Sequence, residues 1–172
     1  PNQQLNQDVY VHIVERNAKG IVITGTKAIV TAAPYVHEFL VMPSRNMRED
    51  DAAFAVCCAV PVDAPGITIV SRPAGRPGEK PEHGAPLFSR KYGQATGVVI
   101  FDRVFVPWER VFLAGDWEFS GDITYNYATH HRHSCIGARA GFGDLLIGAG
   151  VLMCEANGLD PDRKTNLRDP MV

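Results

Sequence analysis

Apolar residues in the first two thirds of the chain come in short runs separated by glycine, proline and polar clusters, a pattern typical of β-strands. Residues 8–15 are rich in β-branched and aromatic side chains, and the turn-forming residues 17–20 lead into a second apolar run, which predicts a hairpin. The predicted strands are residues 8–15, 21–23, 38–42, 52–60, 67–70 and 97–106. Six strands at this spacing predict a mainly β fold, a small barrel or sandwich.

The pattern changes near residue 123. Residues 127–153 contain no proline and many helix-compatible side chains, and the Asn157-Gly158 pair that follows is a plausible helix C-terminus. Five glycines inside this segment each cost a helix roughly 1 kcal/mol against alanine, so a gain such as close helix–helix approach must offset them. We therefore predict a β domain over residues 1–121 and a long C-terminal helix, the start of a helical domain, over residues 122–172.

Composition narrows the class of protein. A net charge of −2 with interspersed acidic and basic residues predicts no nucleic-acid partner, and the absence of a long uncharged apolar run predicts no membrane partner. The four cysteines show no Cys-x-x-Cys pair, which favours buried free thiols and, with the lack of a signal peptide, a cytoplasmic location. The polar start at residues 2–6 indicates that the sequence begins inside a longer chain.

Residues 24–34, TGTKAIVTAAP, contain most of the candidate binding side chains. Gly25 permits a turn or a close backbone approach, while Thr24 and Thr31 offer hydroxyls that donate and accept hydrogen bonds. Residue chemistry alone favours a tight turn with satisfied hydroxyls at this place. Pro34 then interrupts any strand.

Residues 25–31, GTKAIVT, resemble the Gly-x-Lys-x-x-x-Thr segment by which the middle β domain of flavin-dependent acyl-CoA dehydrogenases lies along the isoalloxazine ring. The resemblance implies a fold of the acyl-CoA dehydrogenase middle-domain type and an FAD cofactor. It places Thr31 near flavin N5 and makes Thr24, Gly25 and Lys27 cofactor-binding candidates.

Two further segments are similar to the same superfamily. Residues 98–107, VVIFDRVFVP, resemble the strand that ends its β domain, although an ordinary buried strand would read the same way. Residues 130–141, HHRHSCIGARAG, resemble the start of the C-terminal helical domain of 4-hydroxybutyryl-CoA dehydratases, in which a histidine and a cysteine seven residues later ligate a [4Fe-4S] cluster. His131 matches that histidine, but Ala138 stands at the cysteine position and offers no ligand.

His131 is nevertheless a candidate catalytic base, because imidazole titrates near neutral pH. On a helix, Cys135 would lie on the same face as His131 but about one turn before position 138, where the family has its cysteine. That displacement of about 5.4 Å is large against a metal–ligand bond, so we predict no metal site. Composition alone favours a packed or solvated helix start for these histidines.

The family resemblance leaves two enzyme classes open. The first is an FAD-dependent lyase or isomerase similar to 4-hydroxybutyryl-CoA dehydratase/vinylacetyl-CoA isomerase, without the cluster. The second is a flavin-dependent aromatic hydroxylase of the 4-hydroxyphenylacetate 3-monooxygenase type, which residues 106–111 and the Ser71-Arg72 pair also resemble. The implied partners are an acyl-CoA or a phenolic acid and further copies of the chain in a dimer or tetramer. A third hypothesis is a non-catalytic oligomerisation module built on the glycine-rich helix.

Overall fold

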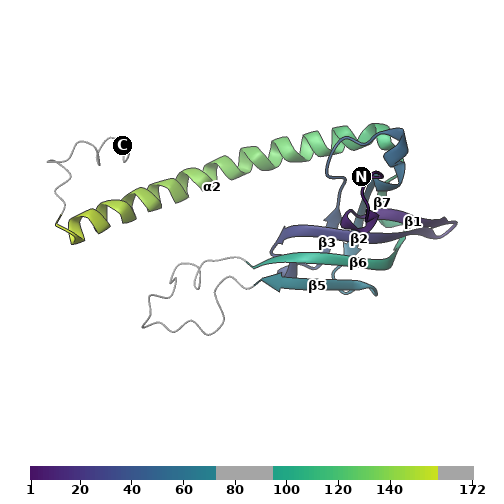
Figure 1. Cartoon of the computed structure of the whole chain (residues 1–172), viewed down its shortest axis with the longest axis horizontal. Coiled ribbons are helices and arrows are strands. Elements are labelled where there is room, and N and C mark those ends of the chain that lie inside the picture. Colours follow the sequence, from purple (N-terminus) through teal and green to yellow (C-terminus); the bar gives the residue numbers. More distant parts are fainter. Residues whose placement is uncertain (73–94, 159–172) are drawn as a thin grey trace. The chain divides into compact units, whose positions relative to one another are not determined.

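The computed structural model describes residues 1–72 and 95–158. The chain divides into two compact units, Pro1–Thr124 and Tyr125–Val172. The first unit contains all the strands that the structure describes, and the second contains most of the long helix (Figure 1). Each unit is described by itself below.

A four-stranded antiparallel sheet has the order β1-β2-β6-β5 (Figure 1). Its strands are β1 (His12–Asn17), β2 (Gly20–Thr31), β5 (Ile67–Arg72) and β6 (Thr96–Pro107). The predicted hairpin is confirmed, because β1 pairs with β2 from His12 opposite Thr24 to Asn17 opposite Gly20. The first strand begins later than predicted, since the side chain of Asn6 caps a short 3-10 helix, η1 (Gln7–Val9).

A three-stranded sheet has the order β3-β4-β7. Its strands are β3 (Glu38–Val41), β4 (Val56–Pro61) and β7 (Val111–Ala114). The prediction of one strand over residues 52–60 is wrong in its first half. Residues 49–54 form a 3-10 helix, η3 (Glu49–Phe54), which starts with three acidic residues that favour a helix N-terminus. The sequence reading also missed β7, a strand of only four residues.

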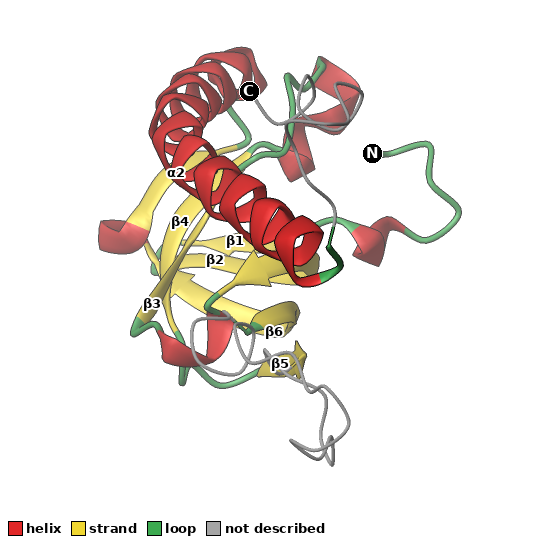
Figure 2. Ribbon diagram, turned by 90° about the vertical axis from the view of Figure 1, so that its left-hand side faces the viewer, coloured by secondary structure: helices red, strands yellow, loops and turns green. Residues whose placement is uncertain are grey.

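The hydrophobic core lies between the two sheets, whose strands are yellow in Figure 2. Buried side chains of both sheets contribute to it, and the rings of Phe39 on β3 and Phe101 on β6 meet edge to face at 6.5 Å. The hydrogen-bonded strands of the described residues form two separate sheets. The sheet-rich fold is thus confirmed as a two-sheet arrangement, and closure into a barrel is not observed in that part of the chain.

Further short 3-10 helices lie in other described connections. They are η2 (Ala33–Tyr35), η5 (Trp108–Arg110) and η6 (Trp117–Phe119). η2 follows β2 directly and contains Pro34, which has no N–H to donate to a strand partner. The sharp end of β2 at Thr31 follows from this sequence.

The long helix, α2 (Ser120–Ala156), confirms the predicted C-terminal helix and starts two residues before the predicted boundary at residue 122. Open space adjoins four glycines of this helix in the described structure, because a methyl group added at Gly137, Gly141, Gly143 or Gly148 would meet nothing within 4 Å. By length and apolar composition alone the helix could cross a bilayer, which the sequence reading did not expect. A core helix of a soluble protein has the same properties, so the absence of a membrane partner stays a prediction.

The start of α2 is fastened to the first unit by Ser120, whose side chain is fully buried. Its Oγ accepts a 2.8 Å hydrogen bond from the N–H of Met47 and donates a 2.6 Å bond to the carbonyl of Trp117. Ser120→Ala leaves the Met47 N–H buried without a partner, so we expect the free energy of unfolding to fall by about 1–3 kcal/mol. Urea denaturation checks this, with Ser134→Ala on the exposed part of α2 as the control; equal losses would contradict the assignment.

Candidate functional site

The candidate site lies on the outer face of the four-stranded sheet, where β2 ends. Side chains of directly paired antiparallel residues share a face, so Val98 of β6 and Val70 of β5 face outward together, and the exposed Ala28 of β2 lies beside them. They form the floor of an open groove of about 550 Å³. The groove is lined by Ala28, Ile29, Val70, Ser71, Thr96, Gly97 and Val98. Its volume is that of a small-molecule site, and its floor is apolar.

Thr31 is the last residue of β2 and is exposed. It pairs with Thr96, one of the residues that line the groove. The segment that residue chemistry predicted to be a tight turn is therefore the end of a long strand. The Thr31 hydroxyl stands at the rim of the sheet beside an apolar groove, an arrangement that suits the polar edge and flat face of an aromatic ring system.

Ile29 and Ala32 on either side of Thr31 have left-handed backbone conformations, with φ values of 59° and 61°. Such values are uncommon for residues other than glycine and are true outliers for a β-branched residue. The sequence gives no signal for them, since neither residue favours positive φ. Ile29 and the β5–β6 side of the groove were accordingly missed as site residues, because their proximity depends on strand pairing across more than 60 residues of sequence.

Thr24 lies elsewhere on the sheet. Its hydroxyl accepts a 3.1 Å hydrogen bond from the N–H of Arg103, a residue with φ of 50° in an irregular part of β6. Seven residues of strand separate Thr24 from Thr31, which corresponds to roughly 23 Å. The structure does not bring these two threonines together, and the hydroxyl of Thr24 already satisfies a backbone donor.

Gly25 is buried beside β1, and the close approach predicted for it is confirmed. A Cβ added at Gly25 would lie 2.1 Å from the carbonyl oxygen of Tyr10, and φ is 125°. The approach is to the chain's own backbone. Whether Gly25 also contacts a cofactor stays a prediction.

Lys27 points into the space between the sheets. Its Nζ donates a 2.7 Å hydrogen bond to the carbonyl of Met42, just beyond β3. Burial lowers the pKa of Lys27, and the neighbouring thiols of Cys58 and Cys57 oppose this shift. Burial likewise raises the pKa of Cys58 to about 12. Lys27 and Thr31 thus lie on opposite faces of the same strand. Cys57 and Cys58 are buried free thiols as predicted, whereas Cys135 and Cys154 on α2 are free but only partly buried.

His131 lies in the second unit, on an exposed part of α2. Its ring stacks on Tyr127 with 5.6 Å between centroids, and its Nε2 lies 3.5 Å from the Sγ of Cys135. These three side chains form a row at four-residue spacing along the helix. Ala138 supplies no donor, and the described residues contain no group of three or more His, Cys, Asp or Glu side chains able to hold a metal. They therefore do not fit an iron–sulfur cluster by themselves.

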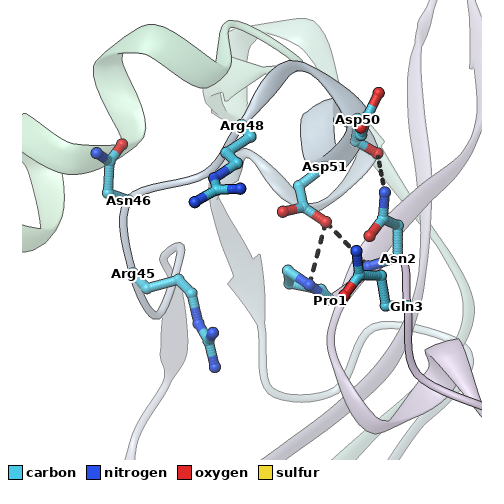
Figure 3. A pocket seen from close by; sticks show the side chains of 8 residues that line it. All are labelled: Pro1, Asn2, Gln3, Arg45, Asn46, Arg48, Asp50 and Asp51. Carbon is cyan, nitrogen blue, oxygen red and sulfur yellow. Dashed lines mark hydrogen bonds and ion pairs between the residues drawn. The ribbon is translucent and has the colours of Figure 1, made fainter.

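A second pocket, of about 310 Å³, is polar (Figure 3). It is lined by Pro1, Asn2, Gln3, Arg45, Asn46, Arg48, Asp50 and Asp51. Its acidic side is already engaged: the carboxylate of Asp51 accepts a 2.9 Å bond from the N–H of Asn2, and the Asn2 side chain donates to the carbonyl of Asp50 at 3.1 Å. The bond from Asn2 is the main reason that the pKa of Asp51 is lowered. We assign this pocket to fastening the first residues against η3.

Solved structures with a similar fold include a CoA dehydratase, the oxygenase component of a monooxygenase and a CoA dehydrogenase. An oxygen-tolerant archaeal 4-hydroxybutyryl-CoA dehydratase from N. maritimus matches with a TM-score of 0.82 and 30% identity, over 99% of this chain and 34% of that chain. The oxygenase component of 4-hydroxyphenylacetate 3-monooxygenase, complexed with FAD and 4-hydroxyphenylacetate, matches with a TM-score of 0.78 and 28% identity, over 99% and 35%. Glutaryl-CoA dehydrogenase, at 16% identity and a TM-score of 0.58, shows the acyl-CoA dehydrogenase-like fold alone.

Sequence comparison leads to the same group. The 4-hydroxybutyryl-CoA dehydratase/vinylacetyl-CoA isomerase of Clostridium aminobutyricum is 34% identical over 174 aligned residues, which cover 100% of this chain and 35% of that protein. The chain thus spans about a third of the length of this relative. The family model for the N-terminal part of 4-hydroxyphenylacetate 3-hydroxylase matches residues 1–113. The resemblance to both enzyme groups is thus confirmed, and the chain belongs to the 4-hydroxyphenylacetate 3-hydroxylase family.

Proposed function

We propose that the chain is the flavin-contacting part of an FAD-dependent enzyme that acts on a small molecule. The observation that carries the proposal is the exposed Thr31 hydroxyl at the rim of an apolar groove on the outer face of the four-stranded sheet. The FAD-bound monooxygenase structure, which matches almost the whole chain, supports the cofactor.

The residues of the groove fit the cofactor. Thr31 would hydrogen-bond the polar edge of the ring, and Ala28, Val70 and Val98 would contact its flat face and exclude water. When bound, FAD supplies electron or hydride transfer. His131 would hold or move a proton on the substrate, because a neutral imidazole accepts a proton at one nitrogen while the other donates. Thr24, Gly25 and Lys27 would act on the cofactor only indirectly, by fixing the strand that carries Thr31.

The first candidate activity is that of a 4-hydroxybutyryl-CoA dehydratase or a related acyl-CoA isomerase, without the iron–sulfur cluster. It is supported by 34% identity to the Clostridium enzyme over the whole chain. Ala138 counts against a cluster held as in that family, so proton transfer by His131 would have to proceed without it.

The second candidate is a phenol-hydroxylating monooxygenase. It is supported by the family model over residues 1–113 and by the match to a structure that holds 4-hydroxyphenylacetate. The full-length protein, purified and assayed both for a crotonyl-type product from an acyl-CoA and for hydroxylation of a phenol with reduced flavin and oxygen, would separate the two. Failure to bind any flavin would favour the oligomerisation module instead.

We also propose a cytoplasmic homo-oligomer, a dimer or a tetramer, with no nucleic-acid or membrane partner. Support for oligomerisation comes from α2, whose large apolar side chains, among them Phe142, Leu146 and Met153, are more than half exposed at 65%, 71% and 67%. Burying such a surface is favourable at roughly 25 cal/mol per Å². Light scattering of the purified protein would give the subunit number.

Thr31→Val is expected to change the flavin more than the fold. Loss of one hydrogen bond of about 0.5–1.5 kcal/mol to the ring corresponds to a shift of roughly 10–30 mV in a two-electron potential. The matched control is Thr26→Val, on the same face of β2 and opposite Ile100. Spectroelectrochemistry of the bound flavin measures the shift. Equal potentials in Thr31→Val and the wild-type protein would contradict the role given to Thr31.

A further inference from the structure

The strand β2 carries one residue more than its partner β6 near its end. Lys27 pairs with Val99 and Val30 with Gly97, so three residue steps in β2 oppose two in β6. The irregularity is therefore a β-bulge at Ala28 and Ile29, and Ile29 adopts the left-handed conformation with φ of 59°.

The bulge reverses which residues face the core. Before the bulge, the side chains of Ile21, Ile23 and Lys27 point between the sheets, as the odd-numbered residues of a strand with regular two-residue alternation do. Continued without interruption, the alternation would turn Thr31 inward and Val30 outward. In the structure Val30 packs against the core and Thr31 is exposed. The bulge, which takes up one extra residue of β2, thus sets the face on which the Thr31 hydroxyl lies.

The bulged conformation of Ile29 contributes little to the stability of the fold. The side chain is 82% exposed, and a β-branched residue at positive φ is strained. Strained residues concentrate at functional sites, and bulges are found where a side chain is turned toward such a site. The Ile29 side chain also forms part of the groove lining, next to Ala28 and across from Val98.

We propose that the Ala28–Ile29 bulge is the positioning device of the flavin site: it turns the Thr31 hydroxyl to the outer face and makes Ile29 a wall of the groove. The part of this inference that concerns the flavin rests on the proposed function. The part that concerns the direction of Thr31 does not, and the two are tested separately.

Thiol labelling tests the direction of Thr31 without any flavin. In a Cys135→Ser/Cys154→Ser background, in which Cys57 and Cys58 are buried, Thr31→Cys is expected to react with a maleimide as an exposed thiol. Inserting a valine between Gly97 and Val98 of β6 gives the extra residue of β2 a partner, removes the bulge and turns position 31 inward, so we expect labelling at least tenfold slower. Thr26→Cys, which precedes the bulge, is the control and should react equally fast with and without the insertion. Unchanged labelling of Thr31→Cys after the insertion would overturn the proposal.

Flavin affinity tests the other part in the full-length protein. The same insertion in β6, in a chain that keeps Thr31, is expected to weaken FAD binding at least tenfold, whereas Ile29→Gly, which keeps the bulge, should weaken it only a few-fold. Slow labelling combined with unchanged FAD affinity would overturn the link between the bulge and the flavin. If the unaltered protein binds no FAD, the proposed function fails, while labelling still decides what the bulge does.

A pair of point substitutions covers the case in which the insertion prevents folding. Val30→Thr places a hydroxyl in the core if the bulge works as described, so its melting temperature should fall by several degrees. Thr31→Val should leave the melting temperature nearly unchanged. The reverse order of these two effects would show that Val30 faces outward and would overturn the proposal.

Discussion

Replacing Gly25 by alanine is expected to lower the free energy of unfolding by about 4 kcal/mol, enough to unfold a marginally stable domain. The added Cβ would lie 2.1 Å from the carbonyl oxygen of Tyr10 and 2.7 Å from the Cα of Val11, the two residues that precede β1. Both contacts are with backbone, so the backbone that leads into β1 must move, and overpacking of this kind costs roughly 1–3 kcal/mol. The φ of 125° adds a further cost of roughly 1–3 kcal/mol for a residue with a side chain.

Urea denaturation followed by circular dichroism measures this effect. Gly148→Ala is the matched control, because a methyl group there meets nothing within 4 Å and alanine favours a helix by about 1 kcal/mol over glycine. The control should be as stable as the wild-type protein or more so. A stable Gly25→Ala protein would show that the backbone of residues 10–11 can move away from β2, and the close approach would then not be required for folding.

The sequence was sufficient to predict most elements of the fold because their signals are local. The β1–β2 hairpin has turn residues between two β-branched runs, and α2 is a long segment without proline. The errors occur where local preference is weak. Residues 52–54 are apolar enough for a strand, yet the acidic residues before them start a 3-10 helix, and β7 is too short to stand out from the sequence around it.

The candidate site was predictable only in part. Thr31 was singled out through a resemblance to a family, and its exposed position at the end of β2 agrees with that choice. Lys27, four residues earlier, was expected beside it, because a regular strand places both residues on the same face. The bulge puts them on opposite faces. A bulge formed by Ala28 and Ile29 has no signal in the residues themselves, because neither favours positive φ. The groove needs the β2–β6–β5 pairing, which is a long-range property.

The contribution of Cys58 to the stability of the first unit is expected to fall by about 3 kcal/mol between pH 8 and pH 11, because its thiol keeps its proton in the folded state. Burial raises the pKa of Cys58 from 9.0 to about 12, so above pH 9 the unfolded chain gives up this proton and the folded chain does not. Stability is then full below pH 9 and is lost as the pH rises toward 12, by about 1.4 kcal/mol per pH unit. The raised pKa of Cys57 acts in the same direction.

Lys27 changes the pH dependence of stability in the opposite direction, so a substitution of Lys27 serves as a control. Burial lowers the pKa of Lys27 below 10.5, so between its folded pKa and 10.5 the unfolded chain holds more protons and stability rises with pH. Cys58→Ala should therefore flatten the decline above pH 9, whereas Lys27→Met should make it steeper. Urea unfolding at pH 8, 9, 10 and 11 measures both, with Cys135→Ala on α2 as a substitution outside the core. A decline that is the same in Cys58→Ala and wild type would show that the thiol between the sheets does not set it.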